Sequence, residues 1–227
     1  ETEHFKIHFH DETEMTAREA ATVAETIFPK ITKFYDFEPK DKTHLILIDP
    51  DDYSNGAAYY YDNKIMIWAS PLDFELRGSH RWLQNVITHE FAHIISLQKA
   101  MKAGTRMPGA YFQFMNYEDE KRPDVLYGFP NALMSYPIPG TVVPPWLAEG
   151  VAQYMYDDAD YDHWDTHRDM ILRDRAIHGN LLSFTEMNTF GKKGIGNEST
   201  YNSGFALSTY IANEYGPEKL KDIMIDL

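Results

Sequence analysis

A pair of histidines inside an apolar segment constrains this chain more than any other feature. The motif His-Glu-Phe-Ala-His at positions 89–93 lies within the run 82–100, where apolar residues surround the predicted helix on nearly all sides. His89 and His93 then stand one turn apart on the same face, so both imidazoles can point at one ion. We therefore predict a buried metal-binding helix, with Ser79 as its N-cap and Gly104 at its end.

Glu90 stands directly after the first histidine of the motif. A carboxylate there lies beside a metal ion rather than on it, where it can take a proton from a water molecule that the metal activates. Zinc accepts such a histidine pair readily, and a metal site would satisfy three polar groups that are otherwise costly inside a core. The alternative is a core helix whose histidines only hydrogen-bond to their neighbours.

Glu149 is the best-placed third ligand in the chain. The Pro144-Pro145 pair predicts a helix start, because proline suits the first helical position. Glu149 follows among apolar residues, where an unpaired charge is costly, and a catalytic zinc needs a third protein ligand after two histidines. The acidic residues at 157–162 lie in a polar run that should be solvated. The alternative is a glutamate at the exposed edge of a helix.

Composition narrows the class of protein. The 227 residues are 43% hydrophobic, which is ample for a core, and contain no cysteine, so any zinc must be held by histidine and carboxylate ligands. The net charge of −14 argues against nucleic acid and anionic membranes as partners. A mean hydropathy of −0.48 without a long apolar run predicts no membrane span.

The residues before the metal helix mix strand and helix patterns. Segment 4–10 alternates as a strand does, and its three histidines should form one solvent-facing row or, alternatively, a second metal site. Residues 16–35 predict an amphipathic helix with a kink or break at Pro29. Residues 44–49 predict a buried strand, and 57–69 a hairpin that turns at Asp62-Asn63. If one of these strands is a sheet edge that borders a substrate cleft, it could pair with an extended peptide.

The residues after the metal helix predict a long irregular excursion over 101–145, whose aromatic residues line a substrate pocket or form a small core of their own. His163 and His167 repeat the four-residue spacing without a following glutamate, which favours a solvated helix ending near Gly179 over a rival metal site. Residues 191–197 predict a flexible loop and 201–216 a packed helix. A last helix follows Pro217 and ends uncapped.

Together these patterns predict an α+β fold. A mixed-sheet lobe over residues 1–104 ends in the metal-binding helix, and a mainly helical lobe over 105–227 carries the third ligand. We expect the lobes to form one catalytic unit that is truncated at its C-terminus. We also expect a periplasmic or extracellular location, although nothing at Glu1 resembles a signal peptide, which a mature chain would lack.

The motif at 89–93, followed by Trp-Leu-Ala-Glu-Gly at 146–150, resembles the gluzincin metallopeptidases, in particular the bacterial peptidase MA-like domains of the thermolysin-type clan. The resemblance covers roughly residues 57–216 and implies a zincin-like fold with the active-site helix between its two lobes. It implies His89, His93 and Glu149 as zinc ligands and Glu90 as the general base. Tyr201 matches a tyrosine on a later helix that can face the developing oxyanion.

The chain departs from relatives of that clan in several places. Gln153 stands four residues after Glu149, where thermolysin has an aspartate, and no third histidine follows His93 at metzincin spacing. The Gly-Xaa-Met-Glu-Asn motif of related aminopeptidases is also missing. Similar domains often precede a β-propeller in longer bacterial proteins, so we expect that a further C-terminal domain could follow.

The resulting hypothesis is a zinc metallopeptidase that hydrolyses a peptide or protein substrate, with metal-activated water and Glu90 as general base. Two alternatives stay open. One is a zinc-binding interaction domain that has lost catalysis, and the other is a zinc hydrolase that acts on a non-peptide bond.

Overall fold

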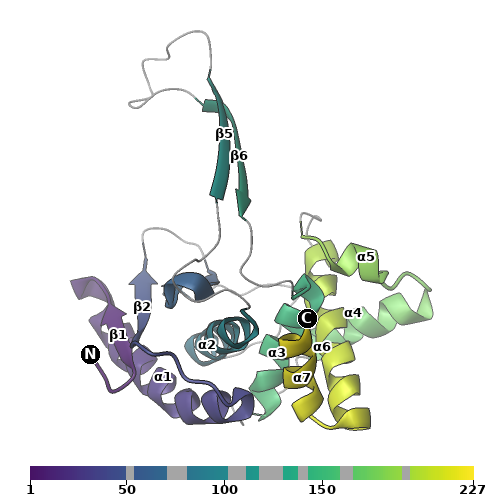
Figure 1. Ribbon diagram of the computed structural model, residues 1–227, viewed down its shortest axis with the longest axis horizontal. Helices are drawn as coiled ribbons and strands as arrows, with labels where there is room; N and C mark the ends of the chain where they lie inside the picture. Colours follow the sequence, from purple (N-terminus) through teal and green to yellow (C-terminus); the bar gives the residue numbers. More distant parts are fainter. Residues whose placement is uncertain are drawn as a thin grey trace.

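A computed structural model describes residues 1–49, 54–70, 81–101, 111–117, 130–137, 143–158, 166–190 and 195–227. In this part of the chain the fold is α+β, with a four-stranded sheet near the N-terminus and a mostly helical remainder. Helix α2 (Trp82–Ala100) lies between the sheet with helix α1 on one side and helices α3, α6 and α7 on the other (Figure 1). The α+β prediction is therefore confirmed.

The sheet has the strand order β1-β2-β4-β3. Strands β1 (Phe5–His8), β2 (Thr43–Ile48) and β4 (Lys64–Trp68) are parallel, and β3 (Gly56–Tyr59) pairs antiparallel with β4 as an edge strand. The short 3-10 helix η2 (Tyr60–Asp62) and left-handed Asn63 make the turn between β3 and β4. The predicted hairpin and its turn are confirmed.

Only one face of the sheet is buried. Leu45, Leu47, Ile65 and Ile67 point into the core, whereas the alternating positions of β2 and β4 on the other face are half-buried. The apolar run at 44–49, which we predicted as a buried strand, is buried on one face and half-buried on the other. A side-chain period of two separates the faces even when both carry apolar residues.

Helix α1 (Glu14–Tyr35), which follows the 3-10 helix η1 (Asp11–Thr13), packs a stripe of small and branched residues against α2 and β1. Ala20, Ala24, Ile27 and Ile31 are fully buried at the i, i+4, i+7 and i+11 spacing of one helix face. The helix continues through Pro29 to Tyr35, so a break at Pro29 is not found.

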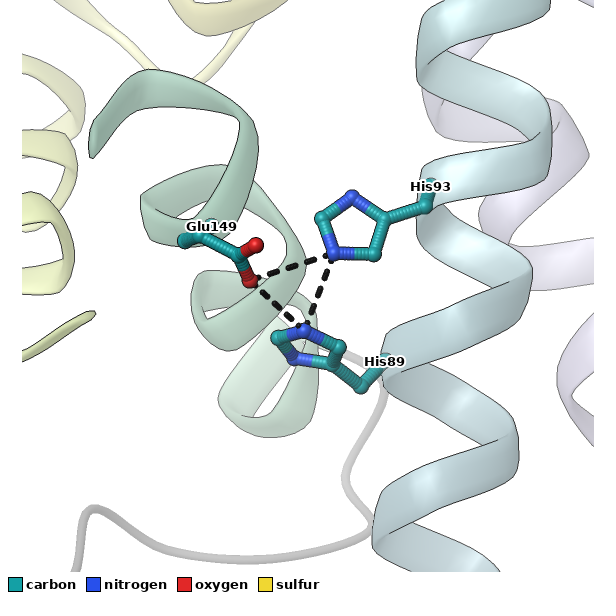
Figure 2. A group of neighbouring side chains, drawn as sticks. All are labelled: His89, His93 and Glu149. Carbon is teal, nitrogen blue, oxygen red and sulfur yellow. Dashed lines mark hydrogen bonds and ion pairs between the residues drawn. The ribbon is translucent and has the colours of Figure 1, made fainter. Parts of the chain in front are cut away.

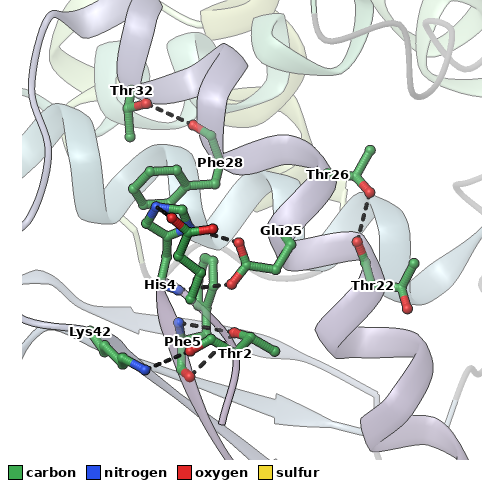
Figure 3. Close-up of polar contacts among 10 residues, drawn as sticks. Thr2, His4, Phe5, Thr22, Glu25, Thr26, Phe28, Thr32 and Lys42 are labelled. Atoms are coloured by element: carbon green, nitrogen blue, oxygen red, sulfur yellow. Dashed lines mark hydrogen bonds and ion pairs between the residues drawn. The ribbon is translucent and has the colours of Figure 1, made fainter.

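His4 ties β1 to α1. Its backbone N–H donates to Glu25 Oε1 at 2.8 Å, its Nδ1 lies 2.7 Å from Glu25 Oε2, and its ring stacks on Phe28 with centroids 3.7 Å apart (Figure 3). His8 instead faces His44, with Nε2 and Nδ1 3.1 Å apart. The prediction of a solvent-facing histidine row holds for His8 and His10, which are exposed, and is wrong for His4, which is half-buried against α1.

Helix α2 has the predicted extent, but its ends differ from expectation. Arg81 in an extended conformation is the N-cap instead of Ser79, and Met101 is the C-cap instead of a stop at Gly104. Trp82 Nε1 donates to the Trp68 carbonyl at 3.0 Å, which links the first turn of the helix to the end of β4. Ser79 and Gly104 themselves lie outside the described residues.

The prediction of an irregular excursion over 101–145 is wrong in its centre. Strands β5 (Tyr111–Tyr117) and β6 (Pro130–Pro137) form an antiparallel pair, which projects away from the rest of the molecule (Figure 1). Tyrosine and phenylalanine favour strands, and that propensity outweighs the scattered glycines and prolines here. The two roles that we considered for the aromatic residues of this stretch, a substrate pocket or a small core, concern side chains outside the described part.

The helical part contains α3 (Pro145–Asp158), α4 (Thr166–Ile177), α5 (Phe184–Met187), α6 (Ile195–Tyr215) and α7 (Glu218–Asp226). The start of α3 at Pro145 and the end of α6 before left-handed Gly216 are as predicted. Helix α6 begins at Ile195, so the predicted loop ends earlier than 197. Sequence analysis missed α5, which a Ser183–Glu186 capping box begins.

The rival histidine pair does not form a described site. His167 is exposed on α4, as predicted for a solvated face, and His163 lies outside the described residues. Among the helices that the structure describes, none combines the length and apolarity of a membrane span.

Candidate metal centre

Helix α2 presents His89 and His93 toward the helical half of the molecule. Both imidazoles and the Glu90 side chain are buried, and the Nε2 atoms of the two histidines are 3.0 Å apart. The remaining faces of α2 carry fully buried Ile87 and Phe91, which fix the helix in the core and thereby set the direction of its polar face.

Helix α3 supplies Glu149 from the opposite side. Its Oε2 lies 3.0 Å from His89 Nε2 and 3.2 Å from His93 Nε2, so the three atoms form a nearly equilateral triangle (Figure 2). Fully buried Leu147 and Val151 hold this helix against the core. The structure thus brings together the three residues that the sequence predicted as a group, although Glu149 is 56 residues from His93 and 60 from His89 along the chain.

A close approach between α3 and α6 fixes the position of Glu149. A Cβ on Gly150 would overlap the Gly204 carbonyl, and a Cβ on Gly204 would overlap the Trp146 carbonyl. Only glycine lets two helix backbones come this near. Because Gly150 directly follows Glu149, this contact determines where α3 aims the carboxylate.

The three ligating atoms suit one metal ion. A tetrahedral ion bound at about 2.0–2.1 Å holds its nitrogen and oxygen ligands about 3.3–3.4 Å apart. The observed separations of 3.0–3.2 Å are close to that spacing. His89, His93 and Glu149 are a buried group that could hold a metal ion, and among the described residues no other group of three has this geometry.

The electrostatics of the triangle also suit a cation. Burial would raise the pKa of Glu149, but the charge of His93 and hydrogen bonds from both histidines outweigh it and lower the pKa. Burial lowers the pKa of His89 to about 4, against the hydrogen bond to Glu149, so its ring is neutral near pH 7. For His93, burial opposes protonation, yet the attraction of Glu149 raises the pKa. An anionic carboxylate therefore faces two imidazole nitrogens, an arrangement that suits a cation.

Glu90 lies beside this triangle and is not part of it. Burial raises the pKa of its carboxyl group to about 7, and the backbone N–H of Ala58, which donates to the carboxylate, only partly offsets that effect. Strand β3 crosses directly over the residue, since a Cβ on Gly56 would lie 2.7 Å from Glu90 Oε1. Sequence analysis missed these two β3 contacts, because no local pattern indicates which strand meets a helix.

Tyr201 reaches the same region from α6. Its ring centroid lies 6.2 Å from that of His89 and 5.8 Å from that of Phe190, with the rings tilted in both pairs. The resemblance therefore selected a residue that does lie next to the triangle. Phe190 carried no signal in the sequence.

No protein-family model, curated protein or solved structure matched this chain in the comparisons made. The site is therefore described by its own geometry.

One further pair near the centre was missed by sequence reasoning. Arg168 on α4 is 4% exposed, its Nη2 lies 3.9 Å from Glu198 Oε2 on α6, and its positive charge contributes to the lowered pKa of His89. We predicted a solvated face for this Asp- and Arg-rich segment. That is wrong for Arg168, because the third residue of α4 turns inward onto α6.

Proposed function

We propose that this protein is a zinc metallopeptidase of the gluzincin type. The observation that carries the proposal is the triangle of His89 Nε2, His93 Nε2 and Glu149 Oε2, with separations of 3.0–3.2 Å, beside a buried glutamate outside the triangle. This is the arrangement of three protein ligands and a separate base that catalytic zinc sites use.

Zinc is the metal that this ligand set favours. Two imidazoles with one carboxylate suit a borderline ion in a four-coordinate site, whereas magnesium and calcium prefer sets made only of oxygen. The carboxylate of Glu149 offsets part of the ion's charge in a buried setting. When bound, zinc would supply activation of a water molecule and polarisation of the substrate carbonyl.

Glu90 has the properties of the general base. A pKa of about 7 lets its carboxylate accept a proton from the attacking water near neutral pH and return it to the amine nitrogen as the C–N bond breaks. The Ala58 amide holds one side of the carboxylate, which restricts its orientation. Tyr201, with its ring next to His89, would donate its hydroxyl hydrogen to the developing oxyanion.

The edge strand supports a peptide as substrate. Strand β3 pairs with β4 on one side only within the described sheet, and it crosses over Glu90. An extended peptide added to this edge would pass close to the proposed base, with main-chain hydrogen bonds independent of its sequence. The position of α2 between a sheet and a group of helices is compatible with the proposed zincin-like fold.

The test is a peptide-library digest read by mass spectrometry, with the zinc content of the same protein measured. We expect one zinc per chain, cleavage of peptide bonds, loss of cleavage with a chelator and its return with added zinc. Zinc binding without cleavage of any peptide would favour a non-catalytic interaction domain. Cleavage that survives full removal of the metal would contradict the mechanism itself.

A further inference from the structure

Aromatic rings extend from the candidate metal centre to the surface. Beginning at His89, the next ring is that of Tyr201 at 6.2 Å, and the ring after it is that of Phe190 at 5.8 Å. Phe190 is 46% exposed, although it is a large apolar side chain. The row therefore leads from a buried ligand to a phenyl ring that solvent can reach.

A second aromatic contact borders the other ligand helix. Trp146 lies one turn before Glu149 on α3, and its ring is 5.8 Å from that of Phe184, which is 60% exposed. Phe184 is the first residue of α5, whose start is fixed by the capping box of Ser183 and Glu186. Two exposed phenyl rings thus stand next to both helices, α3 and α6, that meet at Gly150 and Gly204 beside the centre.

Leaving such rings in water forgoes stabilisation. A phenylalanine side chain gains about 1.5–3 kcal/mol when it is fully buried. Exposed aromatic side chains that gather beside a binding site form an apolar patch of the kind that a ligand can cover. The ring partners of Phe184 and Phe190 among the described residues are the aromatic side chains of Trp146 and Tyr201, so the chemistry that they offer is apolar.

We propose that Phe190 and Phe184, with Tyr201 and Trp146 behind them, form a subsite for a large apolar or aromatic side chain of the peptide substrate. The proposal rests on the proposed peptidase function. Phe190 packs on Tyr201, which lies next to His89. A substrate side chain bound on Phe190 would therefore belong to a residue near the scissile bond rather than far from it. The net charge of −14 further disfavours an acidic residue in that position.

The experiment measures peptide binding to the zinc-loaded Glu90→Gln protein, so that turnover does not interfere. The probes are synthetic peptides that are identical except for Phe, Ala or Asp beside the central peptide bond. We expect Phe to be bound at least about tenfold more tightly than Ala, as expected for burial of one phenyl group. Adding Phe190→Ala should reduce this ratio to within about threefold, and Phe184→Ala should reduce it partly.

Phe9→Ala is the matched control, because Phe9 is also 46% exposed but follows β1 at the opposite side of the fold. It should leave the Phe-to-Ala ratio unchanged. The proposal is overturned if the Glu90→Gln protein shows no preference for Phe, or if Phe190→Ala and Phe9→Ala give the same ratio. Far-ultraviolet circular dichroism confirms that each variant is folded.

Cleavage of the same peptides by the unmodified protein, which retains Glu90, tests the proposed subsite separately from the proposed peptidase function. Preferential binding of Phe peptides without any cleavage would leave the subsite standing and remove the peptidase function. Cleavage at equal rates for Phe, Ala and Asp peptides would leave the function standing and remove the subsite.

Discussion

Glu90 is buried and Glu149 is largely buried, with 13% of its side chain exposed, and their surroundings shift their pKa values in opposite directions. Burial raises the pKa of Glu90 to about 7. Burial acts on Glu149 as well, but the charge of His93 and two histidine hydrogen bonds lower its pKa instead. Such divergence separates roles, because one carboxyl group stays anionic as a ligand while the other can exchange a proton near neutral pH.

Tyr201→Phe tests the proposed oxyanion donor. We expect kcat for peptide cleavage to fall about 10²–10³-fold, because one preorganised donor is lost, while zinc affinity stays the same. Tyr210→Phe is the control on the same helix, since Tyr210 is exposed. An unchanged kcat in folded Tyr201→Phe protein would mean that Tyr201 only packs against His89.

Sequence predicted the residues of the triangle because each carries a local signal. The histidine spacing fixes a shared helix face, and the proline start makes Glu149 an acidic group in an apolar helix. Arg168 and Phe190 carried no such signal, because their burial or exposure depends on how α4 and α5 meet α6. The Ala58 amide also depends on tertiary packing alone.

At the scale of elements, the contact of β3 with α2 positions the proposed base. Gly56→Ala tests it, because the added Cβ would overlap Val86 Cγ2 and lie 2.7 Å from Glu90 Oε1. We expect a loss of about 1–3 kcal/mol in the free energy of unfolding, measured by urea denaturation, together with reduced cleavage. Val86→Ala in the same protein removes one of the clashing atoms and should restore part of the stability. No rescue would show that the overlap with Val86 is not the cause.

The stability that the His4–Glu25 hydrogen bonds contribute between β1 and α1 should depend on pH. Burial would raise the pKa of Glu25, but hydrogen bonds from His4 and Thr2 outweigh it and lower the pKa below 4.5. A lowered carboxyl pKa gives stability that is present above pH 4.5 and is lost as the pH falls through the folded-state value. We expect Glu25→Gln to cost about 1 kcal/mol at pH 7, and less at more acidic pH. An equal cost from pH 7 to pH 3, measured by urea denaturation, would contradict this account.

The elements that sequence predicted best are those with one clear period. Helices α1, α2 and α3 have apolar stripes or long apolar runs. Helices α1 and α3 begin within two residues of their predicted starts, whereas the caps of α2 differ from the predicted Ser79 and Gly104. The strand pair β5–β6 was missed because a long segment separates the two strands, with no short turn signal between them. Helix α5 is a single turn, which leaves no period to detect, although its Ser-Phe-Thr-Glu start at 183–186 is a capping-box signal.

At the scale of the whole molecule, a bound ion would join α2, which packs on the sheet, to α3, which packs on α6. Ligands that bind only the folded state stabilise it by mass action, by about 2.7 kcal/mol at a concentration 100 times Kd. For a chain of this size, that corresponds to a rise in Tm of about 5–10 °C.

Differential scanning calorimetry with and without zinc measures this rise. Glu149→Gln should show a clearly smaller rise, because the anionic ligand is lost. Glu214→Gln is the control, since Glu214 is exposed near the end of α6, and it should show the full rise. Equal rises in the Glu149→Gln and Glu214→Gln proteins would place the zinc elsewhere.

The central claim is that Glu90 acts as the base of a zinc peptidase while His89, His93 and Glu149 hold the metal. The most direct test is the rate of peptide cleavage by Glu90→Gln protein, with zinc content determined on the same sample. We predict one zinc per chain, as in the unmodified protein, and a rate lower by about 10²–10⁴-fold, because the amide cannot accept the proton. A fully zinc-loaded Glu90→Gln protein that cleaves within a few-fold of the unmodified rate would contradict the account.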